Sequence, residues 1–318
     1  MSELPIALQL CPLSPYLEGE LVKRCAVTHW HALDAGAQAA FLAERGAAVR
    51  AVVTGGHIGC PEALLTGLPA LGLVAINGVG FDKVDLALAV AHEVKVTTTP
   101  DVLTDDVADL AVGLVIGLLR GIPAGDAHVR AGLWPEGERP LARRVSGKRF
   151  GVLGLGRIGK AIADRLAAFG PVAYSGTRPH DVVYAYLPDP RALAAASDVL
   201  VVACAANEAT RGLVDAAVIE ALGPDGWLVN VSRGAVVDEA ALIAALDAGV
   251  LAGAGLDVFG DEPRVPAALR ASPRTVLTPH VASATVETRM AMADLVLANL
   301  DAFLAGEPVP TPVAGTPA

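Results

Sequence analysis

Three polar segments, each shortly after an apolar run, carry side chains that could do chemistry. The runs "GWLVNV", "GAGL" and "TVLT" are followed, in order, by Ser232 and Arg233, by Asp257 and Glu262, and by His280 and Ser283. Parallel strands that end at one edge of an open α/β sheet would bring an imidazole, a carboxylate and a guanidinium together there. Such a set can donate a proton and hold an anion, so Arg233, Glu262 and His280 are the candidate catalytic residues.

Each of these residues also has a purely structural interpretation. A single histidine after a strand is usually structural, Arg233 alone could be a surface residue, and Asp257 could merely cap a turn. Metal binding by His280 is not expected, because no second His or Cys stands at ligand spacing. The catalytic interpretation therefore depends on the residues occurring together and on a site for a second reactant.

The segment "GVLGLGRIGKAIADRLAAFG" indicates such a second site. It contains the pattern GxGxxG directly after an apolar strand, and the apolar residues that follow recur at helical spacing: Ile158, Ile162, Leu166 and Phe169. Glycines permit the tight turn and let backbone N–H groups at a helix N-terminus meet a pyrophosphate. We therefore predict a dinucleotide-binding loop made of Gly154, Leu155, Gly156, Arg157, Ile158 and Gly159.

The end of the next strand predicts which dinucleotide is bound. An acidic residue there would hold the ribose 2′-hydroxyl of NAD, but the text is "AYSGTRPH", with Ser175, Thr177 and Arg178 and no acid. Arg178 would pair with a 2′-phosphate, so the sequence predicts that NADP(H) is preferred and that NAD(H) is possible. The alternative is that Arg178 is an ordinary solvated loop residue.

Strand-like and helix-like runs alternate along all 318 residues, which predicts an α/β fold with parallel sheets. The runs "AVVTGG", "LVAING" and "KVTTTP" form a first doubly wound unit, and a second starts near "KRFGVLGLGRIG". The last helix, from about Thr285, is expected to return to the first unit. We therefore predict a dinucleotide-binding Rossmann domain over 100–287, inserted into a substrate domain over 1–99 and 288–318.

Several ordered segments together resemble one known family. "INGVGFDKVDL", "GLGRIG", "VNVSRGAVVDEAAL", "GAGLDVFGDEP" and "LTPHVASAT" are similar to the D-isomer-specific 2-hydroxyacid dehydrogenases, most of all the glyoxylate/hydroxypyruvate reductase branch. The resemblance covers nearly the whole chain. It implies two doubly wound parallel-sheet domains, with the substrate domain flavodoxin-like, and NADP(H)-dependent reduction of glyoxylate, hydroxypyruvate or a similar small 2-oxo acid.

The resemblance also implies roles for particular residues. His280 would protonate the substrate carbonyl, Glu262 would orient and charge the imidazole, and Arg233 would contact the carbonyl and carboxylate. Backbone N–H groups of Val79 and Gly80 would hold the carboxylate. The other implied contacts lie around the cofactor, at Ser232, Asp257 and Ser283.

Two further side chains are candidates for the substrate's surroundings. His57, after the strand "AVVTGG", could contact the distal end of the substrate or face solvent. Trp134 could be a core residue or could close the active site, either in its own subunit or across a dimer.

Composition excludes other classes of partner. A net charge of -10 and 4% aromatic residues give no reason to bind nucleic acid or an anionic membrane. The apolar run over 110–119 is far shorter than the ~20 residues of a membrane span, and an apolar helix of this kind suggests a homodimer. Four cysteines without CxxC spacing and a start without a signal peptide predict a cytoplasmic protein with reduced thiols.

Two other functions remain open from the sequence. The first is an NAD(P)-sensing scaffold on the same fold, like the co-repressor relatives, although the chain has no interaction tail. The second is a reductase for a larger, aromatic or sugar-derived 2-oxo acid. The phosphoglycerate dehydrogenase and formate dehydrogenase branches fit less well, because the acidic NAD mark is missing and a Glu–His pair is present.

Overall fold

The computed structural model describes residues 4–317 and divides into two compact units. Unit 1 comprises Met1–Leu103 and Thr285–Ala318, and unit 2 comprises Thr104–Ala284. One unit is thus inserted into the other, with boundaries a few residues from positions 99/100 and 287/288. The predicted fold class, two α/β domains with parallel sheets, is confirmed.

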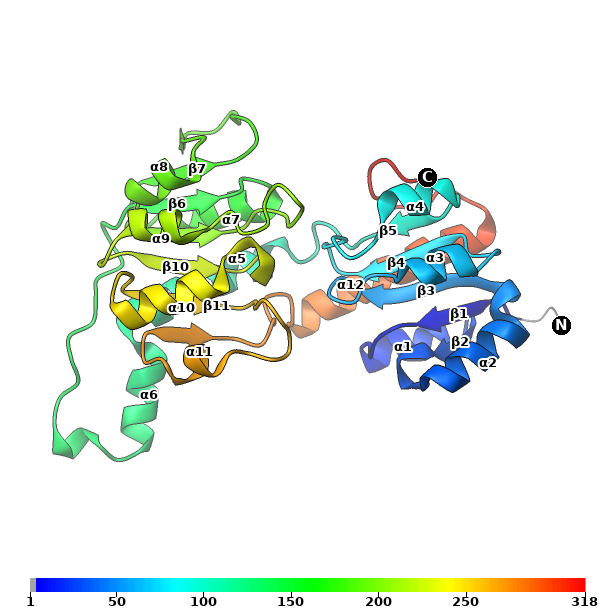
Figure 1. Ribbon diagram of the computed structural model, residues 1–318, viewed down its shortest axis with the longest axis horizontal. Helices are drawn as coiled ribbons and strands as arrows, with labels where there is room; N and C mark the ends of the chain where they lie inside the picture. The colour runs from blue at the N-terminus through cyan, green and yellow to red at the C-terminus, as the bar shows by residue number, and fades with distance from the viewer. Residues whose placement is uncertain (1–3, 318) are drawn as a thin grey trace. The chain divides into compact units, whose positions relative to one another are not determined.

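Unit 1 is built on a five-stranded parallel sheet of order β2-β1-β3-β4-β5 (Figure 1). The strands are β1 (Ile6–Gln9), β2 (Ala26–His29), β3 (Val49–Gly55), β4 (Leu73–Asn77) and β5 (Lys95–Thr97). Nearly every residue of β1, β3 and β4 is buried, as expected for strands that are covered on both faces. The sequence identified only β3, β4 and β5 as strands.

Helices cover both faces of this sheet. One face packs against apolar residues of α2 (Ala35–Arg45), α3 (Glu62–Gly67) and α4 (Leu86–Ala91). The other packs against α1 (Pro15–Leu21) and the long α12 (Val286–Ala305). The helix α12 begins after Thr285, whose hydroxyl accepts a hydrogen bond from the Thr288 N–H and so caps it. Because α12 packs on this sheet, the predicted return of the last helix to the first unit is observed.

Unit 2 is built on a seven-stranded parallel sheet of order β12-β11-β10-β9-β6-β7-β8 (Figure 1). The strands are β6 (Phe150–Leu153), β7 (Val172–Ser175), β8 (Ala185–Tyr186), β9 (Val199–Val202), β10 (Trp227–Asn230), β11 (Gly253–Leu256) and β12 (Thr275–Leu277). All but the short β8 follow the apolar runs in the sequence. The strands β7 and β8 lie on one side of β6, and β9 to β12 lie on the other, so the direction in which strands are added reverses at β6. This topological switch point lies beside the glycine-rich turn that follows β6.

The helices of unit 2 form a layer on each face of its sheet. The apolar side chains of α8 (Pro190–Ala195), α9 (Ala216–Leu222), α10 (Glu239–Ala248) and α11 (Ala267–Ala271) share one core with the strands. On the other face, α5 (Thr104–Arg120) packs against α7 (Arg157–Leu166) and the strands β10 to β12. Arg165 of α7 bonds Asp105 and Asp109 of α5 at 2.9 and 2.7 Å.

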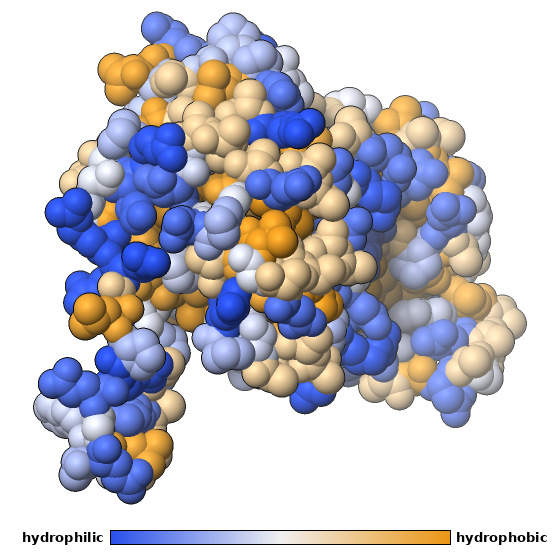
Figure 2. Space-filling view, turned by 60° about the vertical axis from the view of Figure 1, so that its left-hand side comes forward, coloured by the Kyte–Doolittle hydropathy of each residue, from blue (hydrophilic) through white to orange (hydrophobic). Residues whose placement is uncertain are grey.

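Helix α6 (Ile122–Arg130) follows α5 and has no buried residue. The segment projects at the lower left of the ribbon and shows both hydrophobic and hydrophilic surface (Figures 1 and 2). Across residues 4–317 no single helix is long and apolar enough to cross a membrane; only the bent pair α5 and α6 meets the length and composition together. Much of α5 is buried within unit 2.

Candidate active site

Three adjacent strands bring the predicted catalytic residues to one edge of the unit 2 sheet. β10 pairs with β11 and β11 pairs with β12, all in parallel, so the segments after them leave the sheet at the same carboxyl edge. Arg233 follows β10, Glu262 lies on the segment after β11, and His280 follows β12. In the sequence these residues are separated by up to 47 positions (280 minus 233).

His280 and Glu262 form a hydrogen-bonded pair. The Nδ1 atom of His280 lies 2.6 Å from Oε2 of Glu262, and the Phe259 N–H donates to Oε1 at 3.0 Å. Burial alone would raise the pKa of Glu262, but the bonds from His280 and Phe259 and the charges of His280 and Arg233 lower it overall. An ionised carboxylate requires Nδ1 to carry a proton as the donor, which leaves Nε2 of the imidazole for a reacting group.

Asp257 holds the loop that carries His280. Its carboxylate accepts hydrogen bonds from the Thr278 hydroxyl at 2.6 Å and from the N–H groups of Val281 and Ala282 at 2.9 and 3.0 Å. The His280 N–H donates to the Asp257 carbonyl at 2.8 Å, and His280 itself has a φ of 53°, a left-handed conformation. Asp257 is completely buried, so its observed role is to fix this loop, and its predicted contact with the cofactor stays a prediction.

Arg233 lies on a second loop that approaches the Glu262 loop closely. A Cβ atom on the next residue, Gly234, would lie 2.0 Å from the carbonyl of Phe259, so only glycine fits there. The buried Asn230 side chain donates to the Arg233 carbonyl at 3.0 Å and accepts from the Ser232 N–H at 3.0 Å. Asn230 and Gly234 therefore position Arg233; both lie in the segment "VNVSRGAVVDEAAL", but the sequence predicted no role for either.

The GxGxxG pattern forms a strand–turn–helix, as predicted. Gly154 has a φ of 96° and passes close to Cys204, while Gly159 at the start of α7 leaves no room for a Cβ beside the Gly154 carbonyl. Gly156 caps α7 and is exposed, and a Cβ atom added to it would have no other atom within 4 Å. Open space thus lies beside the N-cap of α7, where no side chain bonds the first N–H groups of the helix, a geometry that fits a pyrophosphate.

The other predicted residues of this loop divide by burial. Leu155 is buried at 6% exposure, Ile158 is half-buried, and Arg157 is exposed at the first position of α7. Leu155 and Ile158 can therefore reach a ligand mainly through their backbone atoms, whereas Arg157 can also do so through its side chain.

The residues that were predicted to select the cofactor follow β7. Ser175 is buried, and its hydroxyl donates to the Pro188 carbonyl at 3.1 Å, so its side chain is engaged in the fold. Thr177 and Arg178 are exposed on the loop beyond the strand. No carboxylate stands at the strand end itself, so a phosphate there would meet the cation of Arg178.

The predicted substrate residues of unit 1 lie at the carboxyl edge of its own sheet. Val79 and Gly80 are half-buried in the loop after β4, and His57 is exposed in the loop after β3. Thr54 shapes the latter loop, because its hydroxyl donates to the Gly59 carbonyl at 2.8 Å. In unit 2, Ser232 and Ser283 are half-buried, and Trp134 is 67% exposed.

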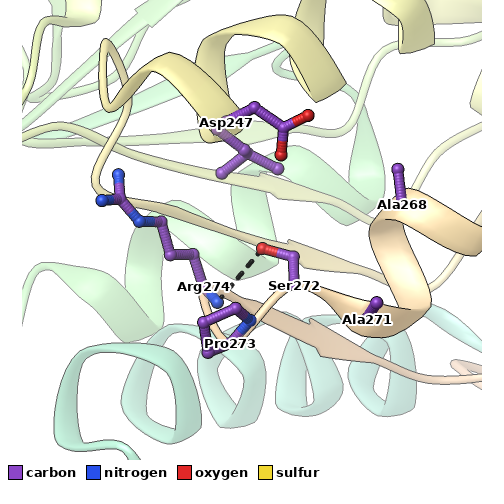
Figure 3. Close-up of a pocket in the computed structure, with 7 residues that line it drawn as sticks. Asp247, Ala268, Ala271, Ser272, Pro273 and Arg274 are labelled. Carbon is purple, nitrogen blue, oxygen red and sulfur yellow. Dashed lines mark hydrogen bonds between the residues drawn. The ribbon is translucent and has the colours of Figure 1, made fainter.

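Other features of the described residues lie away from this chemistry. A surface pocket is lined by α10, α11 and the turn that precedes β12, where the Arg274 N–H donates to the Ser272 hydroxyl at 3.3 Å (Figure 3). This pocket is at the amino end of β12, opposite to the end that His280 follows. Within residues 4–317 no group of three His, Cys, Asp or Glu side chains could hold a metal ion.

Comparison with known proteins identifies the family. Residues 112–282 match the family "D-isomer specific 2-hydroxyacid dehydrogenase, NAD binding domain". The chain is 48% identical to hydroxyphenylpyruvate reductase of Plectranthus scutellarioides over 308 residues, 96% of this chain and 98% of that protein. It is also 48% identical to a glyoxylate/hydroxypyruvate reductase A of Arabidopsis thaliana over 309 residues, with the same coverages.

A solved structure agrees with these relatives. The NADPH-dependent glyoxylate/hydroxypyruvate reductase of Sinorhizobium meliloti, in complex with NADP and malonate, superposes with a TM-score of 0.90 at 41% identity, covering 98% of each chain. The chain therefore belongs to the D-isomer specific 2-hydroxyacid dehydrogenase family, which confirms the resemblance inferred from its motifs. It is an NAD(P)-binding oxidoreductase of 2-hydroxy acids.

Proposed function

We propose that this protein is an NADP(H)-preferring reductase of a small 2-oxo acid, such as glyoxylate or hydroxypyruvate. The observation that carries the proposal is the Glu262–His280 pair, 2.6 Å apart, on the same sheet edge as Arg233. A proton donor beside a cation suits reduction of a carbonyl next to a carboxylate. The named activities of the relatives support the same substrate class.

Arg233, Glu262 and His280 would divide the chemistry among them. Nicotinamide, when bound, supplies the hydride for the carbonyl carbon. The Nε2 proton of His280 passes to the carbonyl oxygen, while the Glu262 carboxylate stabilises the imidazolium that must be present before this transfer. The guanidinium of Arg233 polarises the carbonyl and contacts the carboxylate with its planar fork.

We assign unit 2 to the dinucleotide and unit 1 to the substrate. The backbone of residues 154–159 would hold the pyrophosphate, and Thr177 with Arg178 would contact a 2′-phosphate. Ser175 would act through its position at the strand end, whereas Ser232, Asp257 and Ser283 would border the nicotinamide half. In unit 1, the N–H groups of Val79 and Gly80 would hold the substrate carboxylate, with His57 near its distal end.

We further propose that the protein is a cytoplasmic homodimer. Helix α6 and the turn that follows it expose four large apolar side chains, namely Ile122, Val129, Leu133 and Trp134, which a second copy would cover. In such a dimer Trp134 would be a candidate to reach the partner's active site. All four cysteines are free, which fits a reducing compartment. Light scattering that gives the mass of one chain would contradict the dimer.

Steady-state kinetics on a panel of 2-oxo acids test the proposal. Purified protein should oxidise NADPH in the presence of glyoxylate or hydroxypyruvate. Its kcat/KM for NADPH should be higher than its kcat/KM for NADH. Turnover of hydroxyphenylpyruvate alone would favour a larger aromatic substrate, as the name of the Plectranthus relative suggests. Saturable cofactor binding with no oxidation across the panel would instead support the sensing scaffold.

A further inference from the structure

The loop that follows β7 is largely exposed, but its backbone is anchored at both ends by tyrosines. The Tyr186 hydroxyl donates a hydrogen bond to the Gly176 carbonyl at 3.0 Å. The Tyr174 hydroxyl accepts a hydrogen bond from the His180 N–H at 2.7 Å. Arg178 thus lies midway between the two anchored residues, two positions from each.

The two tyrosines form one unit on the sheet. Tyr174 of β7 and Tyr186 of β8 pair in register, and the centroids of their rings are 5.2 Å apart. Tyr174 is 1% exposed and Tyr186 is half-buried, so the places of their hydroxyls are fixed by the packing around the rings. β8 has only two residues, and one of them holds this loop.

The start of the loop is also tied to the glycine-rich turn. The Gly154 N–H donates to the carbonyl of Ser175, the last residue of β7, at 2.8 Å. Pro179 fixes its own φ and restricts the backbone of Arg178 before it. The backbone of the loop is therefore held beside the turn that fits a pyrophosphate, although the loop contains no regular secondary structure.

The side chain at the centre of the loop is left available. Arg178 is exposed, and its guanidinium forms no ion pair with the residues that the structure describes. Elsewhere in unit 2, exposed arginines such as Arg149 and Arg264 are bonded to carboxylates. A free cation on an anchored backbone is an arrangement that suits an anionic ligand.

We propose that Tyr174 and Tyr186 are positioning residues for NADP(H), because their hydroxyls hold the loop that brings Arg178 to the 2′-phosphate. A loop that is already held in place loses less conformational freedom when its ligand binds, so the ligand binds more tightly. NAD(H) lacks the 2′-phosphate and gains little from this order. The inference rests on the proposed function, and it extends the choice of cofactor to two residues that act only through the loop.

Removal of each hydroxyl tests the proposal, with dissociation constants as the readout. Tyr174→Phe and Tyr186→Phe keep the rings and remove the anchoring bonds, and calorimetric titration with NADP+ and NAD+ measures binding without turnover. Each variant should raise Kd for NADP+ by about three- to fivefold and Kd for NAD+ by less than about 1.5-fold. Amide hydrogen exchange over 176–180 should also become faster, since the loop has lost an anchor.

A double-mutant cycle separates positioning from general destabilisation. If Tyr174 acts through Arg178, adding Tyr174→Phe to Arg178→Ala should change Kd for NADP+ by less than about 1.5-fold. The matched control is Tyr184→Phe, which removes a hydroxyl that donates to Asp164 at 2.7 Å and has no bond to the loop. It should leave both Kd values unchanged.

The possible failures of this experiment are distinct. Equal rises in Kd for NADP+ and NAD+, or no rise in either variant, would overturn the inference while the wild-type preference for NADP+ stands. If Tyr174→Phe does not fold, Tyr186→Phe, whose ring is only half-buried, gives the same readout. Wild-type protein that binds NAD+ as tightly as NADP+ would overturn the proposed cofactor preference itself, and the inference with it.

Discussion

Two groups of candidate residues in unit 2 are held in very different ways. His280 sits on a loop fixed by the buried Asp257, in a left-handed conformation, and its ring is bonded to Glu262. Thr177 and Arg178, by contrast, are exposed on the loop after β7. Proton transfer requires an atom at a defined place, while attraction of a phosphate requires a charge nearby. Substitutions in the first group should therefore have the larger effects.

Replacement of His280 should cause the largest loss. His280→Ala removes the proposed proton donor, so kcat for 2-oxo acid reduction should fall by about 10²- to 10⁴-fold, with a smaller change in KM. Stopped-flow or steady-state assays with NADPH measure this. His31→Ala, an exposed histidine of unit 1, is the control and should keep wild-type kcat. A His280→Ala enzyme with kcat within threefold of wild type, a threshold of about 0.7 kcal/mol, would place the acid elsewhere.

Gly234 tests whether the close approach of the two loops is needed. A Cβ at this position would meet the Phe259 backbone at 2.0 Å, so Gly234→Ala must push the loops apart. We expect a destabilisation of about 1–3 kcal/mol and a loss of activity greater than the loss of folded protein, since Arg233 moves with its loop. Chemical denaturation and kcat/KM on the folded fraction measure the two effects. Gly67→Ala, at the last position of α3 with open space around it, should cause neither loss.

Glu262→Gln should change the pH dependence more than the maximal rate. The proposed reduction takes a proton from His280, so removal of the negative charge bonded to its imidazole should change the pH profile of kcat/KM. The pKa of Glu262 is lowered from its ordinary value of 4.5 in the folded protein. Its pairing therefore stabilises the fold above that pH and stops doing so as pH falls through the lowered pKa.

The pairing of Glu262 should also show in the melting temperature, because the pairing stabilises the fold only where Glu262 is ionised. Glu262→Gln should lower Tm at neutral pH, and the difference from wild type should shrink in acid. Asp261→Asn removes an exposed carboxylate one residue away, which bonds Arg264 at 2.8 Å, and serves as the control. If both variants change the pH profile of kcat/KM equally, a general charge effect explains the change and the specific role of Glu262 is wrong.

Much of this comparison was accessible from sequence because strand ends are marked by composition. The apolar runs before Arg233 and His280 and the glycine pattern at Gly154 predicted the sheet edge and the phosphate turn. The residues that hold the loops at that edge could not be predicted from the sequence, because their role depends on contacts between loops. Asn230 read as part of a strand, and Gly234 as one of 33 glycines, until the structure showed what each touches.

Burial was the second property that the sequence did not show. Ser175 was assigned to the cofactor by its place at a strand end and Asp257 by the family resemblance, and both are buried with their side chains engaged in the fold. The first two strands of unit 1 were not identified either. β2 is only half-buried, so its four residues do not form an apolar run of the kind that marks the other strands.

Arg178→Asp should produce a moderate effect that leaves the chemistry intact. A carboxylate would repel the 2′-phosphate of NADPH and could accept a hydrogen bond from the ribose hydroxyls of NADH. The ratio of kcat/KM for NADPH over NADH should fall by about tenfold, or about 1.4 kcal/mol, while kcat at saturating cofactor stays near wild type. Arg270→Asp makes the same charge change on the exposed face of α11 and should leave the ratio unaltered. A large fall in kcat would instead show that the loop after β7 is as tightly coupled to the chemistry as the His280 loop, and the contrast between the two groups would be wrong.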